Sequence, residues 1–415
     1  MFGRRDNAIG VEDVPLAAIA DAVGTPAYVY SRAVIEDRYR RLSRALAGGR
    51  ARICYAVKAN ANLAILRLML ELGAGFDIVS AGELQRVLRA GGAGEDVVFS
   101  GVGKSVAEID FALKVGIRCF NVESEAELER LEARARLLSR VAPVSVRVNP
   151  DVDAGTHPYI STGRRENKFG VAEGTALDMY RRAAGSHALE VRGIDCHIGS
   201  QVLELGPYAA ARDRLLGIVD TLAAEGISID HVDLGGGFAV PYDGEPGLDV
   251  ETYGREVAAG VFSRGLELIV EPGRYLVAEA GVLLTRVEYL KRATREGQRN
   301  FAVVDAAMND LLRPALYEAR HAVEAVEPND AAPLRWDVVG PVCETGDFLA
   351  MDRDLALTEG ALLAVFGAGA YGMVLSSNYN GRGRAPEVLV SGGEFRVVRR
   401  RETLGDQLAL EGEGR

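Results

Sequence analysis

The sequence of 415 residues has few cysteines, no long apolar run and no excess of positive charge. Its four cysteines, Cys54, Cys119, Cys196 and Cys343, include no CxxC pair, which argues against a disulfide scaffold or a structural zinc site and fits a reducing cytoplasm. No segment is apolar over the length that a bilayer requires. The formal net charge of -11 argues against a general affinity for nucleic acid or anionic membranes. We therefore expect a cytoplasmic globular protein that binds neither.

Signals for metal or nucleotide chemistry are also weak. The five histidines show no HExxH or other paired spacing, so we expect no metal site. The segment 101–105 (GVGKS) is similar to the end of a P-loop, but the earlier glycine that a P-loop requires is replaced by Val98, which excludes a nucleoside triphosphatase. The charged segment 123–129 predicts a solvated helix start, with Glu127 paired to Arg130.

One lysine ends a buried strand. The apolar run 53–57 stops at Lys58 and gives way at once to a helical pattern, so we expect a strand covered on both faces with Lys58 at its C-terminal end. An ammonium group in this position is costly unless it is paired or chemically converted, and an imine with an aldehyde is one such use. The alternative is a lysine that reaches back to solvent.

The pattern of strands and helices after residue 51 predicts an α/β fold. Eight strands separated by helical segments, such as 81–90, 124–138 and 208–225, are the number found in a (β/α)8 barrel. A doubly wound open sheet is the main alternative. The predicted strands are 52–58, 75–80, 97–101, 118–122, 144–149, 191–198, 231–234 and 266–270.

The C-terminal third has a different pattern, with strands and few helices between them. We expect an N-terminal segment over 1–25 that packs on this β-rich part, a barrel over 26–280 and a β-rich domain over 281–415. The predicted strands of the β-rich domain are 282–290, 301–304, 336–339, 362–365, 388–390 and 395–398.

Barrel enzymes place their reacting groups at the C-terminal ends of the strands. A glycine-rich turn there lets the backbone approach a phosphate, and a histidine can stack on a flat ring, although a hydrogen-bonded core histidine is an equal alternative. An amine, a ring, a glycine turn and a carboxylate together suit an aldehyde-bearing phosphorylated cofactor. The strand ends carry Lys58, Asp77, Ser80, Glu123, Asn149, His197, Ser200, Gly235, Gly236, Gly237, Glu271, Gly273 and Arg274.

Three clusters stand out in the β-rich part. Arg313 lies near Tyr317, Cys343 precedes Glu344, and Tyr371 lies in a glycine-rich turn. Each could be an ordinary loop. An amino-acid substrate with a second carboxylate would nevertheless need an arginine, a glutamate and tyrosines of this kind.

These motifs occur in the same order in a known family. The segments 55–60, 197–201, 235–237, 271–274, 343–347 and 369–372, with 147–159 and 167–170, resemble the diaminopimelate decarboxylases of the alanine-racemase-like, fold-type III pyridoxal-phosphate enzymes. The resemblance covers residues 26–401. Tyr275 departs from the small residue that often follows the EPGR motif, which affects only local packing.

The resemblance implies a role for each matching residue. Lys58 would hold pyridoxal 5'-phosphate as an imine and Cys343 would donate a proton, reaching the site from the partner subunit of a homodimer. Glu271, facing the pyridine nitrogen, would favour decarboxylation over racemisation. Cofactor binding would involve Lys58, Asp77, His197, Ser200, Gly235, Gly236, Gly237, Glu271, Gly273, Arg274 and Tyr371, and substrate binding Arg274, Arg313, Tyr317, Glu344 and Tyr371.

The implied reaction converts meso-2,6-diaminopimelate to L-lysine and carbon dioxide, the last step of lysine biosynthesis. Two alternatives are a decarboxylase of another basic amino acid, such as ornithine, arginine or carboxynorspermidine, and a cofactor-binding relative without activity. Lys58 together with Cys343 argues against the inactive relative, and Arg313 favours a substrate with two carboxylates.

Overall fold

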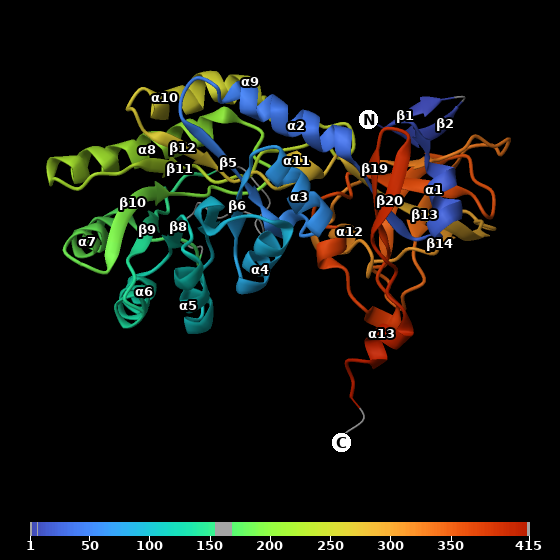
Figure 1. Ribbon diagram of the computed structural model, residues 1–415. Coiled ribbons are helices and arrows are strands. Elements are labelled where there is room, and N and C mark those ends of the chain that lie inside the picture. Colours follow the sequence, from blue (N-terminus) through green and yellow to red (C-terminus); the bar gives the residue numbers. More distant parts are fainter. Residues whose placement is uncertain (1, 6, 154–167, 413–415) are drawn as a thin grey trace. The chain divides into compact units, whose positions relative to one another are not determined.

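The computed structural model describes residues 2–5, 7–153 and 168–412 and divides into two compact units (Figure 1). Unit 1 contains the residues up to Asp37, Pro241–Glu245 and Leu276–Arg415, and unit 2 contains Arg38–Val240 and Pro246–Tyr275. The loop around residues 155–166 and the part of the 147–159 motif after Asp153 lie outside the described residues. No described helix has the length and apolar character needed to cross a membrane.

Unit 2 is a closed barrel of eight parallel strands, which confirms the predicted fold class and excludes the open sheet. The last strand of the barrel pairs with the first, β12 with β5, through Val270 and Ile53. All eight predicted strands are present with small shifts at their ends. They are β5 (Ala51–Ala56), β6 (Gly75–Ile78), β7 (Val97–Phe99), β8 (Cys119–Val122), β9 (Ala142–Arg147), β10 (Leu189–Asp195), β11 (His231–Asp233) and β12 (Glu267–Val270).

Helices follow the barrel strands, and a polar residue after the strand often starts them. Asn62, Ser80 and Ser124 each accept a backbone N–H at a helix start, and Ser105 forms a capping box with Glu108. The helices are α3 (Leu63–Glu71), α4 (Ala81–Ala90), α5 (Val106–Val115), α6 (Glu125–Leu137), α7 (Glu173–Ala184), α8 (Leu205–Ala224), and the joined segments α9 (Val250–Thr252), η4 (Tyr253–Ala258) and α10 (Ala259–Phe262).

Unit 1 is built on a nine-stranded sheet whose main path runs β17-β16-β14-β13-β4-β19-β20, with β18 paired to β13 and β15 paired to β18. The short helices α12 (Arg313–Tyr317) and α13 (Leu404–Leu408) lie outside the sheet. The strands are β4 (Ala27–Ser31), β13 (Gly281–Lys291), β14 (Asn300–Val304), β15 (Val323–Ala325), β16 (Leu334–Val339), β17 (Phe348–Leu355), β18 (Leu362–Phe366), β19 (Glu387–Ser391) and β20 (Glu394–Arg399).

The N-terminal residues belong to this second sheet rather than to the barrel. Strand β4 pairs antiparallel with β13 and parallel with β19, so residues 26–37, which we expected in the barrel, lie in unit 1. The preceding strands β1 (Phe2–Arg5), β2 (Ala8–Val11) and β3 (Val14–Pro15) form a small antiparallel sheet, followed by α1 (Leu16–Val23). Ile9, Leu16 and Ile19 are buried in one apolar cluster with Val282 and Val388.

Candidate active site

Lys58 lies just beyond the C-terminal end of β5, in a single turn of 3-10 helix (η1, Val57–Ala59). Its Nζ donates a hydrogen bond to Oδ2 of Asp77 on the neighbouring strand β6, at 2.7 Å. Asp77 is fully buried, whereas the Lys58 side chain is 41% exposed. The two strands therefore hold a lysine amine beside a buried carboxylate, with one side open to a cavity.

The cavity at this end of the barrel has a volume of about 420 Å³. Three of the residues predicted at strand ends line it, namely Lys58, His197 and Glu271. The prediction missed the remaining lining residues, which are Val79, Ser100, Gly101, Val102, Gly103, Glu108, Arg147 and Phe169. The barrel topology thus brings the lysine, the histidine and the glutamate to one cavity, although the lysine and the glutamate lie more than two hundred positions apart in the sequence.

His197 follows β10, and its Nδ1 accepts a hydrogen bond from the backbone N–H of Gly236 at 3.2 Å. Burial, with the positive charges of Arg147 and Lys58, holds the pKa of His197 well below its usual value. The ring is therefore neutral near pH 7 and carries its proton on Nε2. A neutral, flat ring at the cavity wall suits the stacking role.

The turn 235–237 requires glycine for two reasons. Gly235 and Gly237 have φ angles of +65° and +87°, in the left-handed region that favours glycine. A Cβ atom at Gly236 would lie 2.2 Å from the carbonyl oxygen of Glu271, so the two strand ends touch through their backbones. The Tyr208 hydroxyl also holds the turn in place by donating a hydrogen bond to the Gly236 carbonyl at 2.9 Å.

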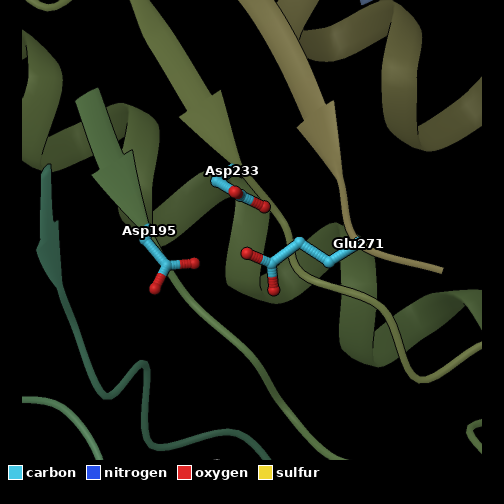
Figure 2. A group of neighbouring side chains, drawn as sticks. All are labelled: Asp195, Asp233 and Glu271. Carbon is cyan, nitrogen blue, oxygen red and sulfur yellow. The ribbon is translucent and has the colours of Figure 1, made fainter. Parts of the chain in front are cut away.

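Glu271 follows β12 and belongs to a group of three buried carboxyls with Asp195 on β10 and Asp233 on β11 (Figure 2). The three strands are neighbours in the barrel, and one oxygen of each carboxyl lies within 4.8 Å of those of the other two. Ser100 Oγ and Asn121 Nδ2 also donate to Glu271 Oε1, at 3.3 and 3.4 Å.

The proximity of these carboxyls raises their pKa values. Burial, together with the charges of the other two carboxyls and of Asp77, raises the pKa of Glu271 well above its usual range. Burial also raises the pKa of Asp233 to about 7, against the opposing effect of a hydrogen bond from Gly235 N–H. Three like charges cannot all persist in this space, so the group retains at least one proton near pH 7.

Arg147, which the prediction omitted, is the buried cation of the cavity. It donates to Glu123 at 3.0 Å and lies 3.9 Å from Asp195, with its guanidinium carbon 4.9 Å from the centre of the Phe169 ring. Glu123 also accepts the backbone N–H of Gly101 at 2.8 Å. A charged residue at the end of the apolar strand β9 was the signal that could have revealed Arg147.

Three other predicted cofactor residues of the barrel, Ser200, Gly273 and Arg274, follow strands β10 and β12. A Cβ atom at Gly273 would meet the side chains of Ala56 and Ala59, which flank Lys58 in sequence. Arg274 opens the short helix α11 (Arg274–Val277). Ser200 lies three residues after His197 and is partly exposed.

The five predicted residues from the C-terminal part all lie in unit 1. Arg313 is 5% exposed, and Tyr317 ends the same helix, α12. Cys343 and Glu344 lie on an exposed loop, where Glu344 accepts a hydrogen bond from the Tyr379 hydroxyl at 2.5 Å. Tyr371 has a φ of +54° in the turn before η5 (Met373–Leu375).

The closed barrel with a lysine, a histidine and a glutamate at its strand ends defines a class of protein, and the comparisons agree. Residues 32–278 match the family model "Pyridoxal-dependent decarboxylase, pyridoxal binding domain". The chain is therefore a pyridoxal-dependent decarboxylase by class.

The relatives narrow this class further. The chain is 59% identical to the diaminopimelate decarboxylase of Pseudomonas aeruginosa, over 99% of this chain and 98% of the relative, and 54% identical to that of Neisseria meningitidis, over 96% and 98%. The solved diaminopimelate decarboxylase of Helicobacter pylori, complexed with L-lysine, is 42% identical with a TM-score of 0.92 over 95% of this chain and 99% of that chain. The chain belongs to the diaminopimelate decarboxylase family, as the sequence motifs predicted.

Proposed function

We propose that this chain binds pyridoxal 5'-phosphate through Lys58 and decarboxylates meso-2,6-diaminopimelate to L-lysine and carbon dioxide. The observation that carries the proposal is the convergence of Lys58, Asp77, His197 and Glu271 at the strand ends of one barrel, in a chain whose relatives share the same decarboxylase name. The solved relatives of H. pylori and M. jannaschii with L-lysine bound support lysine as the product.

The residues present fit the cofactor. The cavity of about 420 Å³ has the size of a small-molecule site, and the glycine turn 235–237 contacts two of its lining residues, His197 and Glu271. Asp77 Oδ1 and Asn121 Oδ1 are buried without a hydrogen-bond partner in the described part of the chain, so polar groups beside the cavity remain to be satisfied. The proposed phosphate ligands are Ser200, Gly236, Gly273 and Arg274, and Gly235, Gly237 and Tyr371 complete the proposed cofactor site.

The barrel residues would act on the cofactor in three ways. When bound, pyridoxal phosphate supplies a cationic aromatic ring that accepts the electron pair of the breaking carbon–carbon bond. Lys58 would form the covalent attachment, and Asp77 Oδ2 orients its amine. His197 would present a neutral imidazole to the face of the ring. Glu271 would hold a proton at the ring nitrogen, which is favourable because the neighbouring carboxyls already make this position attractive to a positive charge.

Cys343 and Glu344 support a dimeric active site. Both side chains are exposed in the single chain. A proton donor and an ammonium ligand that act within their own chain would be expected to lie in a shielded site, whereas exposure is expected if they reach the active site of a partner subunit. We therefore propose a homodimer with active sites at the interface. Cys343 donates the proton that replaces carbon dioxide. Substrate is bound by Arg274, Arg313, Tyr317 and Tyr371, and Glu344 binds its distal ammonium group. The cysteine pattern supports a cytoplasmic location.

The decisive experiment incubates purified protein and pyridoxal phosphate with meso-diaminopimelate and measures L-lysine and carbon dioxide. Ornithine and arginine are assayed in parallel. We expect turnover with meso-diaminopimelate alone. Preferential turnover of ornithine or arginine would replace the proposed substrate, and no turnover of any of the three by cofactor-loaded dimer would overturn the proposed activity.

A further inference from the structure

Arg313 is held by two buried side chains of unit 1 that the sequence analysis did not consider. Its Nη1 lies 2.9 Å from Nε2 of His321, and its guanidinium carbon lies 4.1 Å from the centre of the Tyr242 ring. The rings of Tyr242 and His321 pack edge to face, with centroids 5.1 Å apart. His321 is 0% exposed and Arg313 only 5%, so this arrangement is rigid by burial.

The geometry fixes the proton of His321. An arginine can only donate, so Nε2 must be the acceptor of the contact with Arg313. The ring proton then lies on Nδ1, which donates to the carbonyl oxygen of Phe366 at 2.7 Å. The imidazole is thus a neutral link between a strand carbonyl of β18 and the guanidinium, and it sets the direction of one N–H of Arg313.

The backbone around both supporting residues is anchored in turn. Arg353 donates to the His321 carbonyl at 2.9 Å and to Asp243 at 2.8 Å. The backbone N–H of Ala322 donates to the Tyr242 carbonyl at 2.9 Å. Gly367, with a φ of +69°, leaves room for the Tyr242 ring, because a Cβ atom there would lie 2.7 Å from it.

We propose that His321 and Tyr242 are positioning residues that orient the Arg313 guanidinium toward the carboxylate remote from the reacting carbon, and so set the preference for amino acids with a second carboxylate. This inference rests on the proposed function of Arg313 as a substrate ligand. A guanidinium recognises a carboxylate through two parallel N–H groups in one plane, so the plane must be fixed before substrate arrives. Arg313 presents the charge, while His321 and Tyr242 fix its plane.

Two inhibitors separate this role from general packing. L-lysine keeps the remote carboxylate after decarboxylation, whereas 1,5-diaminopentane has the same two amines and no carboxylate. We compare the holoenzyme with the variants His321→Met, which removes the acceptor, and His321→Gln, whose amide can accept from Arg313 and donate to Phe366. The measurements are kcat and KM for meso-diaminopimelate and the inhibition constants of both amines.

We expect His321→Met to raise KM and the inhibition constant of L-lysine by roughly tenfold to a hundredfold, the value of a hydrogen bond to a charged group. The inhibition constant of 1,5-diaminopentane and kcat should change by less than about threefold. His321→Gln should recover most of the lysine affinity. Equal weakening of both inhibitors, no weakening of either, or a His321→Gln variant as poor as His321→Met would overturn the inference.

A second pair of variants applies if His321→Met does not fold. Tyr242→Leu removes the aromatic face beneath the guanidinium, and Tyr242→Phe keeps it. Only Tyr242→Leu should weaken the binding of L-lysine without weakening that of 1,5-diaminopentane. An equal effect of the two Tyr242 variants would contradict the positioning role of the aromatic ring. If the parent fails to turn over meso-diaminopimelate, the proposed function fails on its own, and calorimetric binding of the two amines to parent and variants still decides on His321.

Discussion

Lys104 and Glu127 form a buried ion pair in the barrel, with Nζ and Oε1 2.7 Å apart and side chains only 1% and 8% exposed. The same ammonium donates to the carbonyls of Gly101 and Asn121, at 2.8 and 2.7 Å. All three of its N–H groups are therefore satisfied. The lysine of the P-loop-like segment joins β8 to the loop after β7, and the pairing of Glu127 with Arg130 that we predicted is replaced by this one.

Removing the lysine should destabilise the barrel strongly. Lys104→Ala leaves Glu127 charged and buried without its cation, which should lower the free energy of unfolding by about 3–5 kcal/mol. Denaturant unfolding of the apoprotein measures this. As a control, Arg400→Ala breaks the exposed pair with Asp406 and should leave the midpoint nearly unchanged. Similar midpoints for the two variants would contradict the structural role of Lys104.

The group of three carboxyls predicts a pH-dependent stability. Asp233 has a pKa of about 7 in the folded chain against 3.8 when unfolded, so the folded state binds its proton more tightly. The parent should therefore lose stability as the pH rises from about 4 to 7. Asp233→Asn stays neutral and can still accept the Gly235 N–H.

The free energy of unfolding of the variant should thus rise relative to that of the parent across this pH window, by on the order of 1–4 kcal/mol at pH 8. Urea unfolding of both apoproteins at several pH values between 4 and 8 gives the difference. A gap that stays constant or narrows with rising pH would show that Asp233 is already ionised in the folded state. Because Asp233 is one cause of the raised pKa of Glu271, the variant should also lower that pKa.

Covalent attachment of the cofactor should depend on Lys58 alone. Borohydride reduction of the loaded parent, followed by peptide mapping, should label Lys58, and Lys58→Ala should show no label and a loss of turnover of at least about a thousandfold. Lys114→Ala, at an exposed position of α5, is the matched control and should behave like the parent. A label at any other lysine would contradict the assignment.

Cys343→Ala should separate cofactor binding from proton donation. The variant should keep its bound cofactor, because Lys58 and the barrel residues proposed to hold it are unchanged, but lose turnover by roughly a hundredfold to ten-thousandfold, the usual contribution of a general acid. Absorbance of the bound cofactor and a carbon dioxide assay measure the two properties. Thr345→Ala, on the same exposed loop, should retain turnover. Unchanged turnover in Cys343→Ala would remove this thiol from the mechanism.

The sequence predicted the barrel well because alternating strands and helices leave a strong periodic signal. It also placed Lys58, His197 and Glu271 at strand ends that the structure brings to one cavity. Asn121 escaped because it lies inside a strand, where a polar residue gives no sign of the face it occupies, and the end of β9 that carries Arg147 was placed two residues too late. The contact of Lys104 with Glu127 depends on the packing of two adjacent βα units, which local spacing does not encode.

The domain boundary was the hardest feature to predict from local pattern. Strand β4 has the composition of any buried strand, and its partners Val282 and Val388 lie about 250 and 360 residues further along the chain. The segment Pro241–Glu245 joins unit 1 through Tyr242 and Asp243, whose partners His321 and Arg353 lie about 80 and 110 residues further along the chain. Long-range pairings of this kind carry no periodic signal.

The place of β4 between β13 and β19 bears on how the polypeptide can be cut and how it is made. A fragment that starts at residue 281 would lack an internal strand of its own sheet and leave the facing edges of β13 and β19 unpaired, which favours aggregation. During synthesis, the first strand of this sheet must likewise wait until nearly the whole polypeptide has left the ribosome before its second neighbour arrives. Truncations that retain β4 (Ala27–Ser31) should therefore give the better yield of native protein.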